Sequence, residues 1–175
     1  HWGRVRTMRR ALPDDHEAAA LGMGACMQVL NMSWRVGVGL DDIDVILEEG
    51  QRDARALGDP IAAAHLAQLH ARAVCGSGDV ARYLDLAVSN ESAALAVGDE
   101  AALALARMWV VDALSFAARF PEALRKADEA LACIPRHVPA AQKILGVHPY
   151  PVVVFWRGFC LYCMGRLNEG LEALD

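Results

Sequence analysis

The residues of this sequence with the greatest capacity for chemistry are its cysteines and histidines. Cys160 and Cys163 form a C-x-x-C spacing, which in other settings binds zinc or exchanges disulfides. No second C-x-x-C and no H-x-x-x-H completes a zinc site, and GFCLYCMG lacks the strand-to-helix setting of a redox motif. We therefore interpret both as thiols that pack between helices, and we expect no metal and no cofactor.

The histidines and carboxylates do not form a catalytic set in the sequence. His65 and His70 are five residues apart, which separates them around a helix instead of placing them together as ligands at i and i+4. The carboxylates of residues 41–49 have the spacing of a helix start and a solvated surface. The sequence contains no G-x-S-x-G, and its GSGD segment lacks the lysine of a phosphate-binding loop.

These absences predict that the segment is not an enzyme. A rival hypothesis places an active site in a helical groove, with His65, Cys160 or Cys163 contributing chemistry.

Composition limits the class of protein. The chain has 175 residues, 55% of them hydrophobic and 22% charged, with a net charge of -5, which is typical of a folded domain and gives no electrostatic basis for binding nucleic acid. No apolar run approaches the roughly 20 residues of a membrane span. An odd number of cysteines spread over helical stretches argues against disulfides and favours a reducing, cytoplasmic location. They are Cys26, Cys75, Cys133, Cys160 and Cys163.

Arginines gather at the start of the chain, at positions 4, 6, 9 and 10. Trp2, Val5, Met8 and Leu12 share a helical face at the same place. The pattern favours an amphipathic helix whose arginines are solvated and whose apolar side faces the protein. Nucleic-acid binding by this patch is the alternative.

The ends of the sequence suggest a segment of a longer polypeptide. The chain begins at His1, without a methionine and within a predicted helical pattern, and stops at Asp175 after barely two turns of another helix. We expect residues 1–175 to form a single helical-repeat domain, with any catalytic domain elsewhere in the parent protein.

Helical signals cover nearly the whole chain, so we predict an all-α fold. Alanine and leucine dominate, and the one β-branched run, VVVF at 152–155, continues into a helix that we start near Pro151. Asp59 and Asp99 are expected N-caps, and Gly58 and Gly98 are expected helix ends. The predicted helices are 2–12, 15–33, 41–57, 60–75, 79–97, 100–117, 121–134, 151–164 and 167–175.

A repeat of 40 residues organises these helices. The same shift aligns Gly58 with Gly98, and Asp59 with Asp99. It also aligns four further sets, which are 38 with 78 and 118, 40 with 80 and 120, 47 with 87 and 127, and 50 with 90 and 130. A fourth hairpin follows at a spacing of 47 residues, from Ala118 to Gly165, after a connector marked by prolines. Such a period predicts stacked helical hairpins, each of which needs a neighbour to bury its apolar face.

The hairpins resemble tetratricopeptide (TPR) repeats. Ala118, Ala123, Ala130 and Pro135 are similar to the last part of that motif, and Gly158, Gly165 and Gly170 to the first part. The consensus aromatics are mostly replaced, and the period exceeds the usual 34 residues. The resemblance implies a TPR-like right-handed superhelix of about four helical hairpins.

One segment carries a narrower resemblance. Residues 148–175, HPYPVVVFWRGFCLYCMGRLNEGLEALD, resemble the C-terminal helical arrays of bacterial proteins that join a class III adenylate or guanylate cyclase to an AAA-type ATPase. Related arrays occur in ATP-dependent transcriptional regulators of the LuxR and maltose-regulator types. The resemblance implies a cytoplasmic protein-interaction or regulatory module of a signalling protein, either a cyclase/ATPase or, alternatively, a LuxR-type regulator.

Stacked hairpins place their first helices along a concave wall that binds partners. We expect this wall to bind a protein, a peptide or other domains of the same chain, and not nucleic acid or membrane. An alternative for two of its polar residues is that Arg72 and Asp112 pair across neighbouring helices. The candidate binding residues are His65, Gln68, Arg72, Met108, Asp112, Ser115, Phe155, Phe159 and Tyr162.

The last predicted helix carries an apolar stripe, Leu167, Leu171 and Leu174. With no following helix to cover this stripe, we expect weak self-association through region 151–175.

Overall fold

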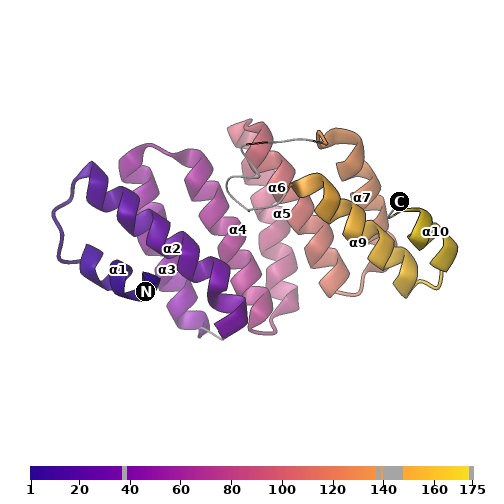
Figure 1. Cartoon of the computed structure of the whole chain (residues 1–175), viewed down its shortest axis with the longest axis horizontal. Coiled ribbons are helices and arrows are strands. Elements are labelled where there is room, and N and C mark those ends of the chain that lie inside the picture. The colour runs from indigo at the N-terminus through magenta and orange to yellow at the C-terminus, as the bar shows by residue number, and fades with distance from the viewer. Residues whose placement is uncertain (37–38, 137–138, 140–147, 174–175) are drawn as a thin grey trace. The chain divides into compact units, whose positions relative to one another are not determined.

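The computed structural model describes residues 1–36, 39–136, 139 and 148–173. Within these ranges the regular elements are α-helices and no strand is present (Figure 1), which confirms the all-α prediction for this part of the chain. Among the described helices, none is long and apolar enough to cross a membrane. The helices, each within a few residues of its predicted range, are α1 (Trp2–Arg9), α2 (His16–Val36), α3 (Leu40–Leu57), α4 (Pro60–Gly76), α5 (Val80–Val97), α6 (Glu100–Phe116), α7 (Phe120–Cys133), α9 (Pro149–Cys163) and α10 (Leu167–Glu172).

Side-chain caps and glycines set several of these boundaries. The Asp59 carboxylate accepts a hydrogen bond of 2.9 Å from the backbone N–H three residues later, and Asp99 accepts the equivalent bond at 2.7 Å. Gly58 and Gly98, with φ of 65° and 73°, lie in the left-handed region just after α3 and α5. The predicted caps and helix ends are therefore confirmed.

Contacts along the chain divide it into two compact units, His1–Leu86 and Ala87–Asp175, and each is described by itself. The boundary falls within α5. The prediction of one repeat domain over 1–175 stays a prediction.

In the first unit, α2, α3 and α4 pack against one another around a core that includes Leu30, Ile43 and Leu66. Gly50 of α3 lies close to both α2 and α4. A Cβ at Gly50 would lie 2.8 Å from a Leu66 methyl carbon and 3.0 Å from Cys26 Cβ, so a larger residue would push the helices apart.

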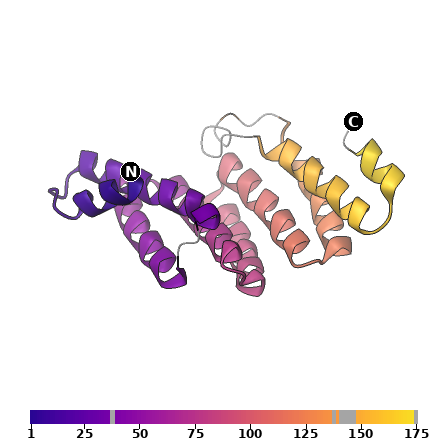
Figure 2. The same ribbon diagram turned by 60° about the horizontal axis from the view of Figure 1, so that its bottom comes forward.

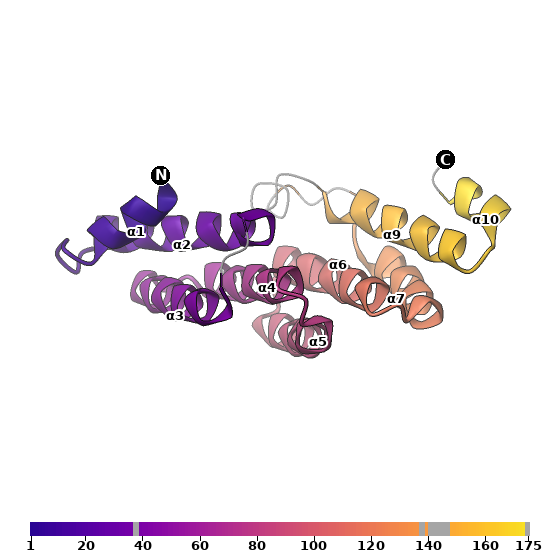
Figure 3. The ribbon, with the colours of Figure 1, turned by 90° about the horizontal axis from the view of Figure 1, so that it is seen from below.

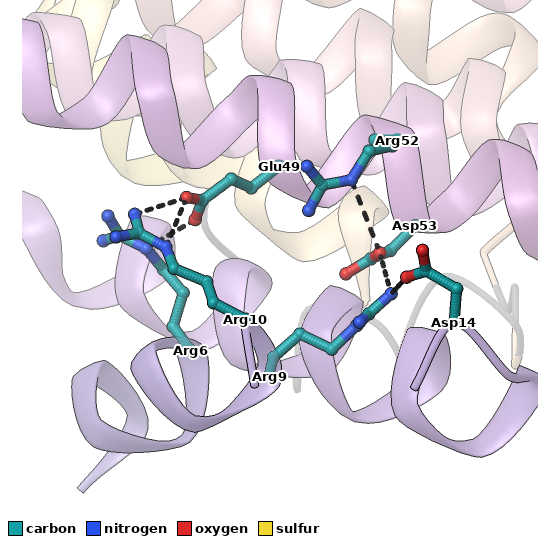
Figure 4. Close-up of polar contacts among 7 residues, drawn as sticks. All are labelled: Arg6, Arg9, Arg10, Asp14, Glu49, Arg52 and Asp53. Carbon is teal, nitrogen blue, oxygen red and sulfur yellow. Dashed lines mark hydrogen bonds and ion pairs between the residues drawn. The ribbon is translucent and has the colours of Figure 1, made fainter. Parts of the chain in front are cut away.

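Ion pairs fasten α1 to α3 (Figure 4). Arg6 Nε and Arg10 Nη2 each lie 2.6 Å from a carboxylate oxygen of Glu49. Arg9, between them, is aimed at a different carboxylate, and its Nη2 lies 3.1 Å from Asp53 Oδ1. Three arginines within about one turn of α1 therefore meet two acidic residues that lie one helical turn apart on α3.

Arg9 has one buried partner and one exposed partner. Its Nη2 also lies 3.0 Å from Asp14 Oδ1. The Asp53 side chain is 3% exposed, whereas that of Asp14 is 94% exposed. The hydrogen bond to Asp14 and the negative charges of both carboxylates raise the pKa of Arg9, against the opposing effect of burial.

The expectation for this helix was wrong in its orientation. Arg9 is buried, whereas Trp2, Met8 and Leu12 are exposed. Burial of a guanidinium is tolerated here because Asp53 lies beside it in the same low-dielectric environment. Hydrophobic periodicity alone predicts the wrong face, because it takes no account of carboxylates supplied by a distant helix.

A polar cavity of about 630 Å³ lies beside these ion pairs, lined by residues of α1, α2, α3 and the α1–α2 connection. Its arginines are matched by aspartates, with Arg9, Arg10 and Arg52 against Asp14, Asp15 and Asp53. The arginines and aspartates that line the cavity therefore balance in charge.

In the second unit, α9 lies along both α6 and α7, and α10 packs on α9 (Figure 3). The core of this unit includes Leu105, Met108, Val111 and Val153, with Trp156 packed against it. The VVVF segment belongs to α9, as predicted, and supplies Val153 to this core.

The α6–α7 and α9–α10 hairpins repeat one local geometry at an offset of 47 residues. Their turn residues, Ala118 and Gly165, have φ of 55° and 77°. The next residues, Arg119 and Arg166, each donate a backbone N–H to the carbonyl five residues earlier. Each arginine also donates its Nε–H to the glutamate three residues later, at 2.8 Å in both hairpins. The predicted fourth hairpin is thus a close local copy of the one before it.

Candidate interaction site

An apolar groove of about 400 Å³ lies between α9 and α10, the antiparallel pair in gold and yellow in Figure 2. Pockets of this size that are lined by aromatic and aliphatic side chains are typical of binding sites. The lining residues are Phe155, Gly158, Phe159, Tyr162, Leu167, Gly170 and Leu171.

The sequence of α9 creates the groove because this helix has two apolar faces. Val153 and Cys160 are fully buried on the inner face, where the helix meets α6 and α7. Phe155, Phe159 and Tyr162 are exposed, and they fall on another face because helical side chains three to four residues apart lie together. An ordinary amphipathic helix has one such stripe, whereas α9 has a second one that is exposed in the described structure.

Two glycines bring the walls of the groove together. A Cβ at Gly170 would lie 3.3 Å from the Gly158 carbonyl oxygen, so α10 approaches the backbone of α9 closely at this point. Both glycines are buried. The floor of the groove is therefore backbone, while its walls are the large side chains on either side.

The aromatic wall of the groove is held by ring contacts. Phe155 and Phe159 are stacked, with an interplanar angle of 20° and centroids 6.4 Å apart. Trp156 and Phe159 are edge to face, with ring centroids 5.4 Å apart. Phe120 of α7 also contacts Phe159 edge to face, with centroids 6.4 Å apart. These arrangements are favourable for aromatic pairs and restrict ring motion. Tyr162, at 65% exposed, is the most open of the three aromatic residues that line the groove.

The nine predicted wall residues have different surroundings. His65, Gln68 and Arg72 belong to α4 in the first unit, and the other six belong to α6 and α9 in the second. The three on α9 are exposed and line the groove described above. A single concave wall containing all nine stays a prediction. Five of them are buried inside the described structure, namely His65, Gln68, Met108, Asp112 and Ser115.

His65 is a neutral buried group. Burial lowers its pKa to about 4, against the opposing effect of a hydrogen bond with Gln68. The imidazole is therefore uncharged at neutral pH. A base that takes a proton only near pH 4 is poorly matched to catalysis at neutral pH.

The two thiols of the C-x-x-C differ in environment, and the expectation that both pack between helices is wrong for Cys163. Cys160 is buried, and its Sγ lies 3.3 Å from Ser115 Oγ, whereas Cys163 is exposed. Burial raises the pKa of Cys160, against the opposing effect of its hydrogen bond with Ser115. A protonated thiol is neither a nucleophile nor a metal ligand. Over the described ranges, three or more His, Cys, Asp or Glu side chains do not come together in a way that suits a metal ion.

Sequence reasoning missed a polar network in the first unit. The buried His70 donates from Nε2 to Asp44 Oδ1 at 2.6 Å, and Arg82 Nη2 donates to both oxygens of the same carboxylate at 2.9 and 3.1 Å. Burial opposes ionisation of Asp44, but the hydrogen bonds from His70 and Arg82 outweigh it and lower the pKa. We call these three residues the Asp44 network. The network joins α3, α4 and α5, and the hydrogen bonds of its three side chains are made to one another.

Comparison with known proteins adds no family to this description. No protein-family model matches the sequence, and no curated protein shows significant similarity to it. Any role assigned to the groove therefore depends on its own residues, which provide an aromatic surface and a close approach of the α10 backbone to α9. The residues that line it contain no acid–base pair.

Proposed function

We propose that this chain is a protein-interaction or regulatory module built of TPR-like helical hairpins, and that the groove between α9 and α10 is its binding site. The observation that carries the proposal is the second apolar face of α9, with Phe155, Phe159 and Tyr162 exposed on a helix whose other face is already packed. Large exposed aromatic side chains held in fixed positions are the residues that contribute most to protein interfaces.

The hairpin geometry supports a repeat architecture of the TPR type. The copied turn at Ala118 and Gly165, with its repeated hydrogen bonds, is the local requirement of such an array. The right-handed superhelix of about four hairpins, expected from the resemblance, remains part of this proposal.

The parent protein that we propose is a cytoplasmic, multidomain bacterial signalling protein of the cyclase/ATPase class. Its support is the resemblance of residues 148–175, which include the whole groove. An ATP-dependent LuxR-type regulator is the alternative parent. The complete reading frame separates the two, because a cyclase domain favours the first and a C-terminal helix-turn-helix favours the second.

We further propose that the segment itself is not catalytic. The neutral, buried His65 and the protonated, buried Cys160 are poor candidates for acid–base or nucleophilic roles. The purified chain should neither hydrolyse ATP nor produce a cyclic nucleotide. Turnover that follows the chain through purification and is lost in a His65→Ala, Cys160→Ala or Cys163→Ala variant would favour the enzyme hypothesis instead.

A peptide library tests the binding role of the groove. Random peptides of about 15 residues displayed on phage would be selected against the chain, and the survivors tested against two variants. Leu171→Glu places a charge in the groove, and Leu95→Glu places one at an equally exposed leucine of α5, the two side chains being 66% and 64% exposed.

We expect selected peptides to bind the wild-type chain and the Leu95→Glu variant but not the Leu171→Glu variant. Circular dichroism confirms that both variants fold. If every selected peptide binds all three proteins equally, the groove is not a binding site and the proposal is wrong.

Weak self-association through region 151–175 is also proposed. About half of each of five large side chains in the groove is exposed, roughly 100 Å² apiece and roughly 500 Å² in total. A stable interface buries about 800 Å² on each partner. Association of two copies through this surface alone should therefore be weak. Leu174, the third leucine of the predicted stripe, lies outside the described residues.

A further inference from the structure

The surface that forms the α9–α10 groove occurs twice in the second unit, once covered and once open. Each residue lining the groove follows, by 47 positions, a residue on the α6–α7 hairpin. Phe155 thus corresponds to Met108, and Tyr162 to Ser115. The shared turn geometry and the repeated Arg–Glu hydrogen bonds place the two hairpins in the same local register.

On the α6–α7 hairpin, the equivalent surface is covered by α9. Met108 and Val111 lie in one buried cluster with Val153 of α9, and Ser115 Oγ lies 3.3 Å from Cys160 Sγ of the same helix. Met108 and Ser115 are buried, whereas their counterparts Phe155 and Tyr162 are exposed. A single helix, lying along the hairpin as α9 lies along α6 and α7, accounts for the difference.

From this repetition we infer that the groove accepts one amphipathic α-helix whose contact face has the chemistry of the inner face of α9. This inference rests on the proposed function and names the kind of partner. The helix lies along α9 and α10 in the way that α9 lies along α6 and α7. Helix-in-groove recognition of this kind uses anchors at i, i+3, i+4 and i+7.

The inner face of α9 defines the chemistry of that partner. Val153, Trp156 and Cys160 stand at i, i+3 and i+7, and they present a branched residue, an aromatic residue and a small residue in that order. On the covered hairpin, Trp156 contacts Phe116, and the residue equivalent to Phe116 in the groove is the smaller Cys163. Cys160 contacts Ser115, and the residue equivalent to Ser115 in the groove is the larger Tyr162. The partner therefore has a large residue opposite Cys163 and a small one opposite Tyr162.

The size of the exposed surface favours a helix over a second copy of this chain. Roughly 500 Å² of exposed apolar surface falls short of the about 800 Å² per partner that a stable protein interface buries. One face of a four-turn helix is about 20 Å long and suits a groove of this size.

A peptide with the inner face of α9 is the probe for this inference. It has the sequence of residues 149–163 with a fluorescein label, and its outward aromatic residues are made polar by F155E, F159K and Y162E. C160A and C163S prevent oxidation and keep the small position small. Fluorescence anisotropy measures its binding to the chain 1–175.

We expect saturable binding that weakens at least about tenfold, or about 1.4 kcal/mol, in the chain variants Tyr162→Glu and Leu171→Glu. The chain variant Leu95→Glu should bind the peptide as the wild type does. Because the α6–α7 surface is intact in all three variants, loss in the first two shows that the peptide occupies the open groove and does not displace the chain's own α9. Tyr162→Ala repeats the test without an added charge.

Two altered peptides test the helical register. An extra alanine between positions 156 and 157 rotates the small residue away from Trp156 by about 100°, and a proline at position 157 breaks the helix. Both should bind at least about tenfold more weakly. Equal binding by either would overturn the inference.

The outcomes separate this inference from the proposed function. If the α9 peptide does not bind but library peptides bind the groove in extended form, the inference is wrong and the binding role stands. If no peptide depends on the groove, both fail. A stable dimer that excludes the peptide, detected by sedimentation and abolished by Leu171→Glu, would make a second copy the occupant and would also overturn the inference.

Discussion

Arg9 offers a sharp test of how burial controls the strength of an ion pair. One guanidinium nitrogen lies 3.0 Å from Asp14 and 3.1 Å from Asp53. The two distances are nearly equal, but the first carboxylate is in solvent and the second is buried. Distance alone therefore predicts equal contributions to stability, whereas solvation predicts very different ones.

The expected magnitudes follow from that contrast. Arg9→Met leaves the Asp53 carboxylate buried without its cation, and breaking a buried pair in this way costs about 3 to 5 kcal/mol. Arg52, whose Nε is 3.9 Å from Asp53 Oδ1 and whose side chain is largely exposed, compensates in part. We therefore expect a loss of about 3 kcal/mol, about a hundredfold in the unfolding equilibrium constant. Asp14→Ala should cost no more than about 0.5 kcal/mol.

Urea unfolding followed by far-ultraviolet circular dichroism measures these free energies, and amide exchange in α1 and α3 assigns the loss to the first unit. The double variant Arg9→Met/Asp53→Leu removes both charges, and it should be close to the wild type in stability. Equal losses for Arg9→Met and Asp14→Ala, or a double variant as unstable as the single one, would refute this account of the pair.

Three further predictions concern the rest of the chain. Gly22→Ala should destabilise the fold by about 1 to 3 kcal/mol, because its Cβ would clash with an Asp53 carboxylate oxygen of the buried ion pair. Gly24→Ala on the same helix has open space around it and should stabilise the fold by up to about 1 kcal/mol. Thermal unfolding compares the two variants, and a loss of stability in both would contradict the packing described for Gly24. Asp44→Asn should lower the free energy of unfolding at neutral pH, because a carboxylate of lowered pKa stabilises the fold while it is ionised. The difference in stability between this variant and the wild type should vanish as the pH falls below the ordinary carboxyl range. A difference that grows in acid would contradict the Asp44 network. Iodoacetamide should modify Cys133 and Cys163 in the native chain and all five cysteines after denaturation, as counted by mass spectrometry, and native modification of the other three would contradict their burial.

The helices and their caps were predictable because their signals are local. An aspartate that precedes an alanine-rich run and a glycine that ends one act within a single turn, so Asp59 and Gly98 could be identified without knowledge of the fold. The exposed aromatic face of α9 was also accessible from helical spacing. Its role as a binding surface remains a proposal.

The ion pairs of α1 were not predictable from hydrophobic periodicity because they join residues far apart in the sequence. Arg9 and Asp53 are separated by 44 residues. A usable signal did exist, because arginines at 6, 9 and 10 form a stripe on one helix and Glu49 and Asp53 form a complementary stripe, four residues apart, on another. The Asp44 network has the same character, since its histidine and arginine come from two later helices.

The groove itself was hidden for a different reason. Periodicity identifies an apolar stripe on α9, but a helix with one stripe already buried and another still exposed has the same residues as a helix buried on both sides. Only the repeat separates the two cases. Met108 and Ser115 are covered by a helix, and Phe155 and Tyr162, at the same positions 47 residues later, are not. In the repeat array that we propose, the packed interface between α9 and the α6–α7 hairpin is therefore the template for the helix that we propose for the exposed hairpin.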